Sequence, residues 1–194
     1  MKANTNTTSM HRHWLAGRIN LTLPALALAL LTCAWQGRAD EDQRAPELPS
    51  SACDSVNVDP GNRVSSHAYA LGVQIYRWNG SSWVFIGPEA KLFADPCYTG
   101  QVGVHYGGPT WEASDGSQVK AALKASCTPF RGAIPWLRLK ATSTSDNGVF
   151  AGVSYIQRVN TVGGTAPATP GDFVGDEARV PYTAEYYFYR ETKE

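Results

Sequence analysis

Alternation of side chains with a period of two residues recurs along the chain from about residue 63 onward. Val73 and Ile75 fall on one face of such a segment, while Gln74 and Tyr76 fall on the other, as in a β-strand. The letters NGSS at 79–82 then indicate a turn, and WVFI returns after it. This pattern predicts a β-hairpin.

Further segments with strand character follow at close spacing, separated by turns rich in glycine and proline. The only helix candidate, residues 120–126, is too short to be stable alone. We therefore predict an all-β, single-domain fold, an antiparallel β-sandwich or barrel of roughly 8–10 strands. Its expected strands after the hairpin lie at residues 101–106, 109–113, 118–124, 135–143, 152–160 and 178–190.

The N-terminal part has a different character. Basic residues precede an apolar run, LTLPALALALLTCAW, and small residues stand at Gly37 and Ala39. This plan is typical of a signal peptide over residues 1–39, cleaved after Ala39, and predicts a secreted or periplasmic protein. An alternative is a lipoprotein lipidated at Cys33. The run is shorter than the roughly 20 apolar residues of a membrane span, so none is predicted.

Removal of residues 1–39 changes the charge of the chain. A total of 17 basic and 17 acidic residues becomes 13 basic and 17 acidic residues, a net charge of −4. A mildly acidic domain lacks the basic face that neutralises phosphates, so no nucleic-acid partner is expected. Residues 40–62 are polar and contain proline, which predicts a flexible leader before the all-β domain of residues 63–194.

Three cysteines follow the expected cleavage point, which allows one disulfide and leaves one cysteine over. We predict the pair Cys53–Cys127, because a tether is useful before the first strand and Cys127 lies at a break between strands. Cys97 would then be free. No C-x-x-C spacing exists, so no metal site is predicted.

Familiar catalytic and cofactor motifs are missing. The sequence has no G-x-S-x-G, H-E-x-x-H, P-loop or G-x-G-x-x-G segment, and we predict no cofactor. Two histidines, His67 and His105, follow residue 39. A small hydrolase would have to use Glu112 together with His105 or with a second carboxylate, and the separation of two carboxylates is not readable from sequence.

The segment HYGGPTWEASDGSQV, residues 105–119, concentrates unusual residues. Two glycines and a proline make one corner, and SDGS makes a second. One interpretation is a kinked strand with Trp111 in the core and Glu112 in water. The other is the rim of a pocket at which His105, Tyr106 and Glu112 converge.

Six blocks along the chain resemble the secreted bacterial and fungal family catalogued as domain of unknown function 3455. The resemblance extends from about Val64 to Arg190 and implies an exported, single-domain protein, but it implies no activity. The blocks are GVQIYRW, WVFIGPEAKLF, VGVHYGGPTWEASDGSQV, AIPWLRLKATS, GVFAGVSYIQRVNTVGG and VPYTAEYYFYR.

Within these blocks, polar residues interrupt otherwise apolar strands. They form either a buried hydrogen-bond network or a ligand pocket among aromatic side chains. The candidate pocket residues are Gln74, His105, Tyr106, Glu112, Gln157 and Arg158.

We expect a non-catalytic module that binds an extracellular or periplasmic ligand, a glycan being one option, or that binds the cell envelope. Two alternatives remain at this point. One is the small extracellular hydrolase, and the other is a structural or stress-protective surface protein.

Overall fold

A computed structural model describes residues 44–192, which fold into eight strands and one short 3-10 helix. The expected signal peptide, its cleavage after Ala39 and the alternative lipidation at Cys33 lie outside the described residues. The strands are β1 (Asn62–Trp78), β2 (Trp83–Phe93), β3 (Gln101–Tyr106), β4 (Thr110–Ala113), β5 (Gln118–Cys127), β6 (Trp136–Thr144), β7 (Val153–Gly163) and β8 (Glu177–Glu191).

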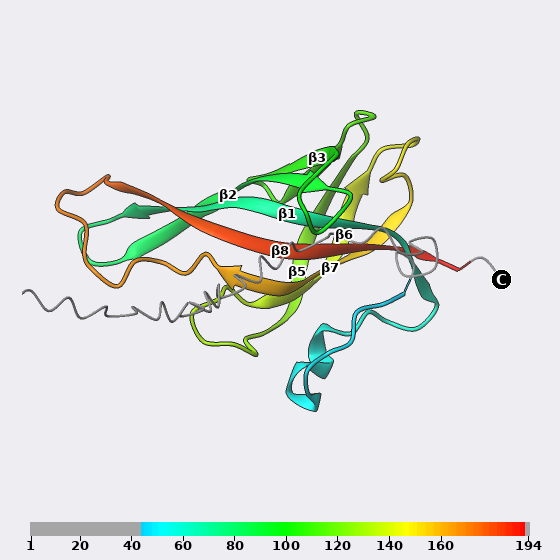
Figure 1. The fold of residues 1–194 in the computed structure, drawn as a ribbon, viewed down its shortest axis with the longest axis horizontal. Coiled ribbons are helices and arrows are strands. Elements are labelled where there is room, and N and C mark those ends of the chain that lie inside the picture. Colours follow the sequence, from blue (N-terminus) through cyan, green and yellow to red (C-terminus); the bar gives the residue numbers. More distant parts are fainter. Residues whose placement is uncertain (1–43, 193–194) are drawn as a thin grey trace, which may run out of the picture. The chain divides into compact units, whose positions relative to one another are not determined.

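Every strand pairs antiparallel with the next along the chain, and β8 pairs back onto β1 to close a barrel. Figure 1 shows β1 and β8 running side by side. The predicted all-β fold is therefore confirmed, and the choice between sandwich and barrel is decided for the barrel. The helix candidate at 120–126 is part of β5.

The inside of the barrel combines large aromatic side chains with alanines. Trp111, Tyr186 and Phe188 are each 1% exposed, and they meet alanines contributed by several strands. A narrow barrel accommodates bulky rings only where small residues face them. Gly72 serves the same end, because a Cβ there would overlap the Glu89 carbonyl oxygen on the neighbouring strand.

A second apolar cluster lies on the opposite face of β7 and β8. Tyr155, Val159 and Tyr189 are buried there, together with Val64, Trp136 and Tyr187. Their cover comes from the segment before β1, in which η1 (Ser51–Val56) buries Cys53 and Val56 almost completely. The leader that the sequence led us to expect as flexible over 40–62 is thus packed against the barrel from Cys53 onward.

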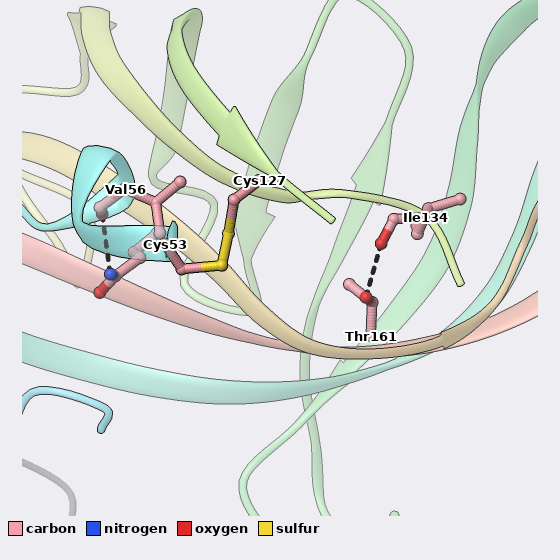
Figure 2. Close-up of a disulfide and its surroundings, with 6 residues drawn as sticks. Cys53, Val56, Cys127, Ile134 and Thr161 are labelled. Carbon is pink, nitrogen blue, oxygen red and sulfur yellow. Dashed lines mark hydrogen bonds between the residues drawn. A yellow bond between two sulfur atoms is a disulfide. The ribbon is translucent and has the colours of Figure 1, made fainter. Parts of the chain in front are cut away.

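A disulfide bond links η1 to β5 of the barrel. Cys53 of η1 is bonded to Cys127 at the end of β5, as predicted, across a sequence separation of 74. Figure 2 shows this bond beside the hydrogen bond from Thr161 to the Ile134 carbonyl. No cysteine of residues 44–192 is free, so the expectation that Cys97 would be a spare thiol was wrong.

Candidate ligand-binding site

An opening in the barrel wall follows from strands of unequal length. β3 pairs with β2 only from Glu89 onward, and β4 pairs with β5 only as far as Lys120. Residues 84–88 of β2 and 121–127 of β5 therefore continue past the short β3–β4 hairpin. Only its turn, Gly107–Pro109, stands between them, and so the wall is incomplete here.

A cavity of about 220 Å³ lies at this opening. Phe85, Ile86 and Leu123 are about half exposed and form its rim. The remaining lining comes from β2, from the β3–β4 hairpin with its exposed turn, and from β6, β7 and β8. It consists of Gly87, Pro88, His105, Gly108, Pro109, Trp111, Leu137, Leu139, Arg158 and Tyr186.

Arg158 is the only charged residue of that lining. It is 8% exposed, and both Nε and Nη2 donate to the Pro135 carbonyl oxygen, at 3.1 and 2.8 Å. No carboxylate of the described chain pairs with it. A guanidinium has five N–H donors, so three remain for another acceptor. A buried charge without a counter-ion is costly, which makes Arg158 the unusual feature of the site.

His105 lies beside Trp111, with ring centroids 4.2 Å apart and planes at 9°. Its Nδ1 is 2.8 Å from the Thr110 carbonyl oxygen, which only accepts hydrogen bonds, so Nδ1 carries the proton. Burial, with a smaller contribution from the charge of Arg158, lowers the pKa of His105 to about 3. The imidazole is therefore neutral at physiological pH and serves as a flat, weakly polar surface of the cavity.

Trp111 contributes the second unsatisfied donor. The residue is 1% exposed, and its Nε1 has no hydrogen-bond partner. An indole N–H only donates, and buried polar groups normally find partners. The Nε1 atom is itself enclosed by protein, so of these two residues only Arg158 offers a donor to a ligand in the cavity.

Two of the six candidate residues point away from this cavity. Glu112 accepts hydrogen bonds from Tyr106 Oη and from Gln118 Nε2, both at 2.9 Å. Because Glu112 follows the buried Trp111 in the same strand, its side chain lies on the outer face. The barrel wall thus separates Glu112 from His105, and these two groups do not converge.

The two glutamines are buried but lie elsewhere. Gln157 donates to the Val56 carbonyl oxygen at 2.9 Å and accepts from Tyr189 Oη at 2.6 Å, so it holds η1 on the outer face of β7. Gln74 is 2% exposed and lies near Gly164, away from the cavity lining. Of the six candidates, the structure brings together His105 and Arg158.

Sequence reasoning missed several residues of the cavity. In the sequence they occupy ordinary strand positions. They are the rim residues Phe85 and Ile86 and the deeper residues Leu137, Leu139 and Tyr186. The available signal was the doublet Phe85–Ile86. An apolar run in a strand whose outer face meets water leaves apolar side chains exposed, and here both members are about half exposed.

The lining offers little for catalysis. It contains no Ser, Thr, Cys, Asp or Glu, so His105 has neither a nucleophile to activate nor a carboxylate to orient it. The described residues also contain no group of three or more His, Cys, Asp or Glu side chains that could hold a metal ion. The arrangement is suited to binding an apolar body through its walls and an acceptor through Arg158.

Comparison with known proteins places the chain in a family without an assigned function. The family model described as protein of unknown function DUF3455 matches residues 59–190. The chain belongs to this family. The DUF3455 match spans all eight strands except the final residue of β8, and therefore includes the whole cavity. No curated protein and no solved structure matches the chain.

The described part of the chain, residues 44–192, contains no helix of sufficient length and apolar character to cross a bilayer. The Cys53–Cys127 bond is consistent with an oxidising compartment, extracellular or periplasmic.

Proposed function

We propose that this DUF3455 protein is a non-catalytic binding module that holds a small, mainly apolar ligand in the cavity at the wall opening. The observation that carries the proposal is an apolar cavity of about 220 Å³ that contains one buried, unpaired guanidinium. Small-molecule sites commonly combine apolar walls with a few polar groups that fix orientation.

The lining favours an apolar ligand over a glycan. A sugar carries many hydroxyl groups, and each hydroxyl buried against Leu137 or Leu139 would lose its hydrogen bonds to water. The hydrolase alternative that pairs Glu112 with His105 gains no support from the geometry, since these two side chains lie on opposite sides of the wall. A purely structural role does not account for a charge left unpaired inside the barrel.

We also infer that the chain acts after export, in the secreted or periplasmic fraction. The basic start, the apolar run and the small residues before Asp40 support this inference, and so does the disulfide.

The test of the binding proposal is a variant that fills the opening. Leu123→Trp places a larger side chain at a rim position that is 57% exposed, where it costs little stability. Val84→Trp is the matched control, because Val84 is 43% exposed and does not line the cavity. Binding of 1-octanol, an apolar probe, is measured for both variants by saturation-transfer NMR.

We expect octanol to bind to the wild type and to Val84→Trp, and to bind at least tenfold more weakly to Leu123→Trp. Equal binding to all three proteins would show that the probe uses another surface. Absence of binding to the wild type would refute the proposed function for this cavity.

A further inference from the structure

The charge pattern of the cavity specifies its ligand further. We propose that the ligand is an amphipathic monoanion, an aliphatic or aromatic carboxylate, whose head group is bound by Arg158 and whose apolar body extends toward the rim. This inference rests on the proposed function and adds the chemical class and the orientation of the ligand.

The buried charge of Arg158 carries a cost in hydration. If Arg158 were present only to bond the Pro135 carbonyl oxygen, a neutral donor would serve as well without the loss of hydration. A bound carboxylate supplies the counter-charge that the described residues do not. A guanidinium and a carboxylate are also matched in shape, since both are planar and form paired hydrogen bonds.

The cavity lining also holds one positive charge and no negative charge. The Arg158 guanidinium keeps donors that the Pro135 carbonyl oxygen does not use. His105 is uncharged, so it adds no second positive charge. One cation with free donors matches a ligand that bears a single negative charge and several acceptor lone pairs. A dianion would remain half neutralised, and a cation would be repelled.

The charged and apolar parts of the cavity lie at different depths, which sets the orientation of the ligand. Arg158 is 8% exposed, whereas Phe85 is 51% and Leu123 is 57% exposed. The charged group therefore lies in the deep part of the cavity and the apolar groups lie at its mouth. An amphipathic anion enters with its head first, and its tail stays between Phe85, Ile86 and Leu123. The exposed apolar rim is then covered by the ligand, and the apolar area lost from water contributes to the affinity.

The experiment compares two probes with the same eight-carbon body, octanoate and 1-octanol, on the full folded protein at pH 7.5. Dissociation constants are measured by saturation-transfer NMR, and the ratio of the two constants is the readout. Charge-assisted hydrogen bonds are worth about 1.5–3 kcal/mol, which corresponds to about a tenfold or greater preference for octanoate.

Three variants test the role of Arg158. Arg158→Leu removes the charge, and we expect the preference for octanoate to disappear while octanol binding persists. Arg158→Lys keeps the charge but lacks the planar pair of donors, so part of the preference should remain. Arg179→Leu is the matched control, because it removes the same charge from an arginine that pairs with Glu89 on the outer face.

Each result is decisive. Wild-type protein that binds octanol and octanoate equally would overturn the ligand class while leaving the proposed function intact, and this comparison does not depend on the folding of any variant. A preference for octanoate that survives in Arg158→Leu, or that is lost in Arg179→Leu, would also overturn the inference. Failure of both probes to bind would refute the proposed function itself.

Discussion

At the scale of single residues, neighbours in one strand have opposite surroundings. Trp111 is 1% exposed inside the barrel, while Glu112 bonds to Tyr106 and Gln118 on the outside. The alternation of strand residues required that only one of the two could face the core. The segment 105–119 is therefore a corner of the barrel and also a wall of the cavity, because Trp111 and His105 both line it.

Substitution of these two neighbours should have very different effects. Trp111→Ala is expected to lower the free energy of unfolding by about 3–5 kcal/mol, because it leaves a void among aromatic rings. Glu112→Gln is expected to cost less than about 1 kcal/mol, since its contacts are at the surface. Urea denaturation of both variants measures the difference. Similar losses for the two variants would contradict the placement of these side chains.

His105 makes stability depend on pH. Its pKa is about 3 in the folded protein and about 6.5 when unfolded, so the unfolded chain binds an additional proton between these values. The stability from the neutral imidazole is fully present above pH 6.5 and is lost as the pH falls toward 3. Between pH 7 and pH 5, this group should remove about 2 kcal/mol from the free energy of unfolding.

The measurement compares wild type with His105→Gln in urea titrations at pH 7 and pH 5. The variant should lack this loss, whereas groups common to both proteins cancel in the comparison. Identical pH dependence in the two proteins would show that His105 does not remain neutral on folding.

At the scale of elements, the short helix η1 is held by contacts from distant strands. Gln157 of β7 bonds to the Val56 carbonyl oxygen, Arg138 of β6 contacts Asp59, and Tyr155 Oη donates to the same carboxylate at 2.5 Å. The hydrogen bond from Tyr155 and the nearby Arg138 also lower the pKa of Asp59. The polar composition of residues 40–62 predicted a flexible leader. Contacts with distant strands cannot be predicted from local composition.

Loss of the disulfide should release this element. In the chain-entropy model, a bond that closes a loop of 74 residues contributes about 4 kcal/mol. We expect Cys53→Ser with Cys127→Ser to lower the free energy of unfolding by about that amount, measured in urea without reductant. Cys53→Ser alone is the control and should give the same loss. An unchanged midpoint would show that the remaining contacts of η1 hold it without the bond.

At the scale of the whole molecule, the sequence predicted what depends on local pattern and missed what depends on closure. The period of two along β1 and β7 gave the all-β fold, and export made the pairing of Cys53 with Cys127 plausible. Barrel closure depends on the register between β1 and β8, which no local pattern encodes. Arg158 was found as a candidate because it is a polar residue in an otherwise apolar strand. Leu137 and Tyr186 line the same cavity but were not found, because their proximity to Arg158 depends on closure of the barrel.

Export of the chain and cleavage of its N-terminal segment remain predictions. We expect a mature N-terminus at Asp40, because small residues at Gly37 and Ala39 precede it and a basic, apolar segment leads to it. Intact-mass analysis of the protein recovered from the secreted or periplasmic fraction measures this end directly. A mass that corresponds to a chain beginning at a lipidated Cys33 would contradict the prediction and favour the lipoprotein alternative.

The pairing of the first strand with the last has a consequence for the order of folding. Residues 62–77 of β1 find their partners in 177–191 of β8, so the seam joins residues that are 100 to 129 positions apart. A chain leaves the ribosome N-terminus first, and one edge of β1 therefore has no partner until β8 has been made. Strand pairs between such distant segments form slowly. The barrel is expected to close only after β8 has been synthesised, and β1 is the segment most exposed to pairing with other chains before then.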